Sequence, residues 1–283
     1  MMKRILKAYN VFLLAAFLIM SANTMAGEEP KVEKKKTFSK THSVGKNDKI
    51  SLTNQFGELK LNTWNKNEVK VDVTITAKAN TDERAQQILD RISIEDGKNN
   101  SGVYFKTKLV DDRGHKKNNK ENYKNEGMTI DYVVYLAASN PLNLSNSFGS
   151  TIIPDYNGEA DIETKFGTLT AGNLPNAKEI TVEFGDATIE SVHDGKIIVK
   201  FSQALVHKLS GNIEAVFEHS SGTKLGIGND IKRLNVKNNF STLYIDVSKD
   251  LSANFDIRTN FGDFSNKTNF AISKEDEDED RRG

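Results

Sequence analysis

Residues that could do acid–base or metal chemistry are scattered along this chain rather than gathered into a motif. The histidines share no metal-ligand spacing; they are His42, His115, His193, His207 and His219. Glycan cleavage needs two carboxylates at one site, yet the acidic residues of the central region fall in different phases of the local pattern: Asp155, Asp161, Glu163, Asp186 and Glu190. No Gly-x-Ser-x-Gly, phosphate-loop or zinc motif occurs. We therefore expect no enzyme activity and no catalytic, cofactor-binding or metal-binding residue.

The chain begins with the pattern of a secretory signal. Lys3, Arg4 and Lys7 precede an apolar run over residues 11–20, and small residues around Ala26 offer a cleavage site. A run of about ten apolar residues is too short to cross a bilayer, which needs ~20. We expect residues 1–26 to be a signal peptide, with an uncleaved membrane anchor as the alternative. The protein is then exported in the Gram-negative manner, to the periplasm, the outer-membrane surface or the medium.

Charge and cysteine content narrow the class of protein further. The expected signal contains three basic and no acidic residues, so the rest of the chain has 36 basic and 39 acidic residues. That balance gives no electrostatic reason to bind nucleic acid. Membrane contact is peripheral if it occurs. The chain has no cysteine, so its stability must come from burial and hydrogen bonds rather than disulfides.

An internal repeat in the sequence indicates the secondary structure that positions these side chains. An aromatic residue recurs as an anchor, with spacings of 18, 18, 17, 18, 21 and 21 residues from the second copy onward. The anchors are Phe56, Phe148, Phe166, Phe184, Phe201, His219, Phe240 and Phe261. The next residue is always Gly or Ser, which indicates a sharp corner: Gly57, Gly149, Gly167, Gly185, Ser202, Ser220, Ser241 and Gly262.

Alternation within each unit predicts two short strands joined at that corner. Ile180, Val182 and Phe184 share one parity and are expected to face inward, followed by Ala187 and Ile189 after the corner. Such a unit is too small to bury its own inner face, but stacked copies bury it together. We predict an all-β fold: a β-solenoid of the parallel β-helix type with about 18–21 residues per rung.

Two outward columns are candidate features of the stacked surface. Lys165, Glu183, Lys200 and Glu218 precede four successive anchors, and their alternating signs favour stacking. Four residues after the anchors lies a semi-apolar column that we treat as a candidate binding strip: Ile152, Thr170, Thr188, Leu205, Thr223 and Tyr244. Ordinary solvated β-surface is the alternative for this column.

The remaining segments predict a β-rich region before the main stack, with one helix. Asn80 can cap a helix at about 81–92, since Glu83 follows and an apolar stripe continues to Ile92. The expected parts are a signal peptide (1–26), a flexible charged leader (27–36), an N-terminal β-rich capping region (37–141) with a polar loop (111–127), solenoid repeats (142–272) and a disordered acidic tail (273–283).

The repeated unit resembles a known family. The stretches "NQFGELKLNTW", "NSFGSTII", "TKFGTLTA" and "TNFGDFSN" are similar to exported bacterial β-solenoid proteins of unknown function described as putative adhesins, which are related to the head domains of putative autotransporter adhesins. The resemblance covers about residues 37–272 and is carried by structural positions. It implies a solenoid fold and an adhesin-type role, and it supplies no catalytic residue.

The sequence thus favours a non-catalytic adhesin or surface-binding module of the cell envelope. Its ligand would be a glycan or a protein at the cell surface or in the envelope. One alternative is a periplasmic structural protein or signalling partner, which stacks end to end or sits beside a sensor. A minor alternative is a polysaccharide-active enzyme, since some parallel β-helices cleave acidic glycans.

Overall fold

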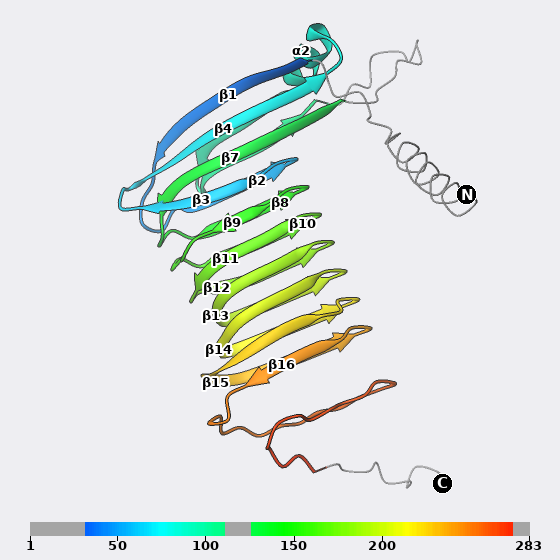
Figure 1. The fold of residues 1–283 in the computed structure, drawn as a ribbon. Helices are drawn as coiled ribbons and strands as arrows, with labels where there is room; N and C mark the ends of the chain where they lie inside the picture. Colours follow the sequence, from blue (N-terminus) through cyan, green and yellow to red (C-terminus); the bar gives the residue numbers. More distant parts are fainter. Residues whose placement is uncertain (1–31, 111–125, 274–283) are drawn as a thin grey trace, which may run out of the picture. The chain divides into compact units, whose positions relative to one another are not determined.

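The computed structural model describes residues 32–110 and 126–273. The expected signal peptide, residues 111–125 of the polar loop and residues 274–283 of the acidic tail lie outside the described residues. Within the described ranges nearly all regular structure is β-strand, with one short helix, α2 (Asp82–Asp90) (Figure 1). The all-β prediction is confirmed.

The early strands are β1 (Val32–Ser43), β2 (Lys49–Gln55), β3 (Leu59–Trp64), β4 (Glu68–Ala79), β5 (Ile92–Asn99), β6 (Gly102–Leu109) and β7 (Gly127–Ala137). The later ones are β8 (Leu142–Ser147), β9 (Thr151–Ile153), β10 (Ala160–Lys165), β11 (Thr168–Leu174), β12 (Ala177–Glu183), β13 (Asp186–Lys200), β14 (Gln203–Glu218), β15 (Thr223–Asn239) and β16 (Leu243–Val247).

The chain divides into two compact units. The smaller unit contains residues up to 37, residues 74–93 and residues 108–129; the larger contains residues 38–73, 94–107 and 130 onward. Several strands, such as β4 and β7, contribute residues to both.

The smaller unit contains the helix. Thr81 caps α2 by accepting a hydrogen bond from the Arg84 amide at 3.2 Å, so the cap lies one residue after the expected Asn80. Ala85 and Leu89 are buried. The Arg84 guanidinium is held by the Glu126 carboxylate at 2.8 and 2.9 Å. The helix ends at Asp90, two residues before the expected last residue, Ile92, which is the first residue of β5.

The start of β1 corrects the prediction of a flexible leader over residues 27–36. Residues from Val32 onward form a strand despite their charge. Lys34 pairs with Asp82 at 2.6 Å, and Glu33 pairs with Lys35 at 3.0 Å. The strand lies at the end of the sheet order, next to β4, and charged side chains are well tolerated on an edge strand.

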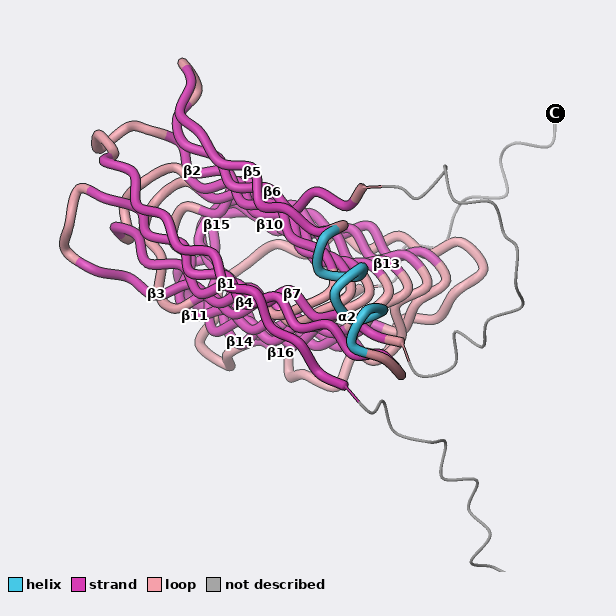
Figure 2. The backbone as a smooth tube through the Cα atoms, turned by 90° about the horizontal axis from the view of Figure 1, so that it is seen from above, coloured by secondary structure: helices cyan, strands magenta, loops and turns pink. Residues whose placement is uncertain are grey.

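The larger unit is a parallel β-solenoid with two strands per rung. One face follows β2, β8, β10 and β12 and continues into the second half of β13, while the other follows β3, β9, β11 and the first half of β13. The strands β13, β14 and β15 each return from one face to the other, so the sheet wraps around the core. Figure 1 shows the rungs in sequence from β2 and β3 to β16, and Figure 2 looks along the stack.

The core is built from the predicted inward columns. Leu144, Ile162, Ile180 and Ile197 lie in register on neighbouring strands, and each is at most 3% exposed. Stacking buries the apolar side chains on the inner face of each rung. A single rung cannot bury them by itself, so the fold requires repeats. The rung at Phe56 belongs to the same stack, because Asn54 pairs in register with Asn146 of β8.

The stack of strands ends earlier than the repeat does. Residues 248–273 form no strand, and Phe261 is fully exposed, so the expected rung at Phe261 and Gly262 is not part of the sheet. The last strand is β16, which pairs with β15 among the described residues.

Candidate functional site: an exposed aromatic ladder

The anchor side chains form a continuous ladder of stacked rings on the outside of the solenoid. Neighbouring ring centroids are 4.8–5.1 Å apart and the ring planes differ by 3–7°. The rings belong to Phe56, Phe148, Phe166, Phe184, Phe201, His219 and Phe240. Phe184 is 48% exposed, and Phe240 at the end of the ladder is 85% exposed. The prediction that the anchors face inward is therefore wrong.

The backbone explains the error. Every anchor has a left-handed backbone conformation, with φ between 49° and 63°, and this directs the side chain away from the inward parity of Val182. For an L-residue that conformation costs roughly 1–2 kcal/mol, and it is uncommon for bulky side chains. Ring stacking, worth about 0.5–1.5 kcal/mol per pair, offsets a cost of that size. Seven strained aromatic residues in register mark this edge as a special feature of the fold.

Main-chain hydrogen bonds hold each anchor in place. The Phe184 amide donates to the Lys200 carbonyl at 3.1 Å, and the Phe201 amide donates to the Glu218 carbonyl at 2.9 Å. The same bond runs from every ladder anchor before Phe240 to the residue before the next anchor. The ring positions are thus fixed by the strand register, and the ladder is a rigid surface.

The corner glycines are required for close approach rather than for their own torsion angles. No positive φ is found at Gly57, Gly149, Gly167 or Gly185. A Cβ atom on Gly185 would lie 1.8 Å from the Gly167 carbonyl oxygen, and one on Gly167 would lie 2.0 Å from that of Gly149. The rungs meet backbone to backbone here, which leaves no room for a side chain.

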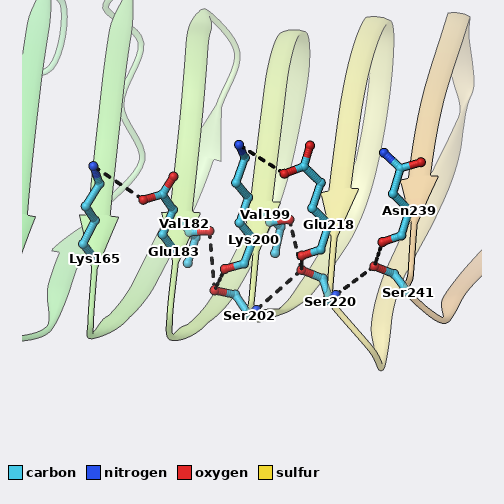
Figure 3. Close-up of polar contacts among 10 residues, drawn as sticks. All are labelled: Lys165, Val182, Glu183, Val199, Lys200, Ser202, Glu218, Ser220, Asn239 and Ser241. Carbon is cyan, nitrogen blue, oxygen red and sulfur yellow. Dashed lines mark hydrogen bonds and ion pairs between the residues drawn. The ribbon is translucent and has the colours of Figure 1, made fainter.

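The later corners replace this contact with a serine ladder (Figure 3). The Ser202 hydroxyl accepts from the Gly185 amide at 3.0 Å and donates to the Lys200 carbonyl at 2.6 Å. The Ser241 hydroxyl accepts from the Ser220 amide at 2.8 Å and donates to the Asn239 carbonyl at 2.8 Å. Serine therefore bridges successive rungs through its side chain, whereas glycine allows the backbones to touch.

Paired charges border the aromatic ladder on one side. Lys165 contacts Glu183 at 3.5 Å and Lys200 contacts Glu218 at 3.2 Å, so the predicted alternation produces ion pairs between rungs (Figure 3). The Glu163 carboxylate accepts a hydrogen bond from Lys165 and raises the pKa of that ammonium above its ordinary value. The residues on the other side of the ladder are polar, among them Asp186 and Gln203, both exposed. The apolar strip thus has a polar rim with little net charge.

The residues of the candidate binding strip on the second face point outward in all but one position. Ile152, Thr170, Thr188 and Leu205 lie in register and point outward. The next residue of this column is Lys224, which pairs with Leu205 and with Tyr244. Thr223 is fully buried instead, because the corner after His219 is one residue longer and turns at Gly222, where φ is 87°. The strip is thereby interrupted by a lysine.

Polar side chains inside the first rungs support the corners. The side-chain amide of Asn54 donates to the Ile130 carbonyl at 2.8 Å, and the side-chain amide of Asn146 donates to the Ser150 carbonyl at 2.9 Å. Thr107 donates to the Asn54 side-chain oxygen at 2.9 Å. Burial raises the pKa of Tyr132 to about 12, although its hydrogen bond with Thr107 opposes this. These groups are structural, because their partners are main-chain atoms and one another.

The histidine and acidic side chains that could do acid–base chemistry make contacts in pairs, such as His42 with Asp96 at 2.6 Å. Asp155 and Asp194 hold neighbouring rungs together: the Asp194 carboxylate accepts from the Asn212 amide at 2.6 Å, which keeps its pKa below the ordinary value. His193 contacts Ser210 at 2.9 Å. Among residues 32–110 and 126–273, no three His, Asp or Glu side chains are grouped so that they could hold a metal ion. In the same ranges, no helix is long and apolar enough to cross a membrane.

Comparison with solved structures yields likenesses of low TM-score. A putative cell adhesion protein from Clostridium sporogenes is 10% identical, with 76% of this chain and 100% of that chain covered and a TM-score of 0.31. A putative adhesin from Bacteroides fragilis is 12% identical, with 76% and 98% covered and a TM-score of 0.37. One from Parabacteroides merdae is 11% identical, with 76% and 97% covered and a TM-score of 0.30.

These likenesses are distant. No protein-family model matches the chain, and its sequence matches no curated protein. The β-solenoid fold implied by the family resemblance is confirmed by the strand pairing described above. Similarity at this level says nothing about a ligand or an activity.

Proposed function

We propose that this protein is an exported, non-catalytic binding module of the cell envelope, adhesin-like in role, and that the aromatic ladder is its contact surface. The observation that carries the proposal is the ladder itself: seven rings, most of them half exposed, each held in a strained backbone conformation. Large apolar strips rimmed by polar residues are typical of interaction sites in soluble proteins.

The stacking geometry favours a protein ligand over a glycan. Sugar rings bind aromatic side chains through the open face of the ring. In the ladder each inner face lies against the next ring, at about the rung spacing of 4.8 Å, so ring edges face the solvent. A row of apolar edges flanked by paired charges suits an extended segment with alternating apolar and polar side chains. Aromatic residues are also enriched at the centres of protein interfaces.

A surface-binding role requires the protein to be exposed on the cell. Protease treatment of intact cells, followed by immunoblotting, should remove the chain while periplasmic markers survive. Protection of the chain until the outer membrane is opened would overturn the surface role. It would favour the alternative of a periplasmic structural or signalling-partner protein.

Direct binding tests the ladder against the candidate strip. The purified chain is applied to immobilised matrix proteins (collagen, fibronectin, laminin) and to polysaccharides (cellulose, chitin, alginate). The ladder variant carries Phe166→Asn, Phe184→Asn and Phe201→Asn, since Asn tolerates the left-handed conformation. The matched control changes the strip in the same rungs, with Thr170→Asn, Thr188→Asn and Leu205→Asn.

We expect binding to at least one matrix protein, lost in the ladder variant and retained in the control, while both variants melt cooperatively. Binding that is retained without the rings would overturn the ladder as the contact surface. Binding to polysaccharides alone would replace the protein ligand with a glycan.

A further inference from the structure

No strand among residues 32–110 and 126–273 covers the C-terminal end of the solenoid. Residues Ile231–Asn239 of β15 pair with β14, and β16 pairs with the first part of β15; among the described residues nothing pairs with their outer edges. Inward-facing side chains that are buried in earlier rungs are exposed in the last rung. Leu225 is 1% exposed, whereas its neighbour Ile245 in the last rung is 43% exposed. The unpaired edge and the open core together form a surface that an additional strand would complete.

The segment directly after β16 has the sequence of a further rung. Relative to Phe261, the column positions hold Ile257, Thr259, Gly262 and Phe264, as in the stacked rungs. Phe261 also has a φ of 57°, within the range of the seven stacked anchors, although it is fully exposed and outside any strand. Sequence pattern and backbone conformation are two separate indications that this segment is built to stack.

We propose that the open edge of β15 and β16 is a docking surface and that its occupant is residues 253–264 of the same chain, added as a parallel rung. Phe261 then stacks on Phe240 and extends the aromatic ladder. By the rule of the other rungs, the Phe240 amide donates to the Asn260 carbonyl. Ile257 and Phe264 close the inward columns. This inference does not depend on the proposed function.

Chain length favours this occupant over a segment from a second copy. The spacing from Phe240 to Phe261 is 21 residues, the same as from His219 to Phe240, which spans one complete rung. The segment can therefore reach the edge of its own chain without a longer connection. In the structure the ring centroids of Phe255 and Phe270 are 5.4 Å apart, and the side-chain amide of Asn266 donates to the Phe270 carbonyl at 2.9 Å. Phe255, Ile257 and Phe264 are each more than 40% exposed there, so docking would bury apolar surface.

A disulfide tests the docking directly, because the chain has no native cysteine. Asn239 lies in the outward column beside the ladder, in register with Glu218 (Figure 3), and Asn260 would lie next to it in the docked rung. Neighbouring strands are ~4.8 Å apart. That spacing is within the reach of a disulfide, which needs Cα atoms closer than about 7 Å. The variant Asn239→Cys/Asn260→Cys in the full chain is oxidised mildly and run on a non-reducing gel.

We expect an intramolecular disulfide, seen as a faster-migrating monomer. The out-of-register control Asn239→Cys/Lys267→Cys should form it much more slowly. Adding Ile257→Asp should slow cross-linking by about tenfold or more, since a charge in the inward column opposes docking. The stack from β2 to β16 should still melt cooperatively in this variant, because Ile257 is outside its strands.

Three outcomes would overturn the proposal. Equal cross-linking of the in-register and out-of-register pairs would show a mobile segment without a docking site. A disulfide-linked dimer would show that the edge accepts a second copy, which would favour a self-assembling envelope protein. The absence of any disulfide would show that this segment does not dock on the edge.

Discussion

The corners at Gly149, Gly167 and Gly185 and the corners at Ser202, Ser220 and Ser241 make the same turn by different means. In the first set the backbones of successive rungs touch, and a Cβ atom would lie within about 2 Å of a carbonyl oxygen. In the second set a side-chain hydroxyl joins one rung to the next. The aromatic stacking is the same in both, with centroid distances of 4.8 Å between Phe166 and Phe184 and between Phe201 and His219.

The difference shows that the ladder, rather than the residue after it, is the constant feature of the repeat. Glycine and serine each allow the anchor to keep its left-handed conformation and its main-chain bond to the next rung. They fail in different ways when changed: glycine corners are sensitive to added volume, whereas serine corners are sensitive to lost hydrogen bonds. The following predictions test that contrast, from the largest expected effect to the smallest.

Gly185→Ala should cost about 3 kcal/mol of unfolding free energy or more, because the new Cβ meets a backbone carbonyl that cannot move aside. The φ of Gly185 is not positive, so the loss would come from contact alone. Urea unfolding measures it. Gly127→Ala is the control: nothing lies within 4 Å of a Cβ there, and we expect little change. Equal stability of the two variants would contradict the close approach of the rungs.

Ser202→Ala should cost about 2 kcal/mol, since the Gly185 amide loses its acceptor in a nearly closed corner. The exposed Ser221 is the matched control, and Ser221→Ala should leave the urea midpoint almost unchanged. If Ser202→Ala were as harmless as the control, water would be replacing the hydroxyl, and the serine ladder would not stabilise the corner.

Phe184→Asn should cost about 1 kcal/mol or less. Two ring stacks are lost, but asparagine relieves the left-handed strain that phenylalanine bears. Ile180→Ala, an inward residue of the same rung, should cost about 2–5 kcal/mol. Thermal and urea melts of the two variants give the order. The reverse order would place the anchor in the core after all.

Acid should weaken the rung contact at Asp194 selectively. Its pKa is held below the ordinary 3.8 by the Asn212 backbone amide and, next, by the Asn212 side chain. Its contribution is therefore complete above pH 3.8 and is lost as the pH falls through the folded pKa. Asp194→Asn should be slightly less stable than the unmodified protein near pH 6, and the two should converge as the pH falls from 3.8 through the lower folded pKa of Asp194. Glu190→Gln, at an exposed position of the same strand, is the control for the removal of a negative charge alone.

Much of the larger unit could be predicted from residue types alone. The inward columns from Leu144 to Ile197 stack as the alternation of apolar residues requires, and the charge alternation from Lys165 to Glu218 becomes real ion pairs. These predictions succeed because each depends on neighbours two residues away or one rung away. A fixed rung length converts such local patterns into spatial ones.

The residues of the aromatic ladder were predicted in position, as structural anchors, but neither their outward orientation nor a contact role was predicted. Parity holds along a strand and fails where a residue adopts a positive φ, as all anchors do. The sequence contained a signal that could have revealed this: in every unit an aromatic residue stands immediately before a Gly or Ser corner residue, where a strand ends. The error at Thr223 has a similar origin, because one additional corner residue shifts the phase and brings Lys224 to the surface.

The sequence by itself determined the rung length, the buried columns and the position of the corners, because hydrophobic periodicity is a local property of the chain. Only the tertiary structure decided which way the rings point and why the corners hold glycine or serine. Both answers depend on atoms of adjacent rungs: a carbonyl oxygen 1.8 Å from an absent Cβ at Gly185, and a ring 4.8 Å from Phe166. Contacts of that kind exist only once the copies are stacked.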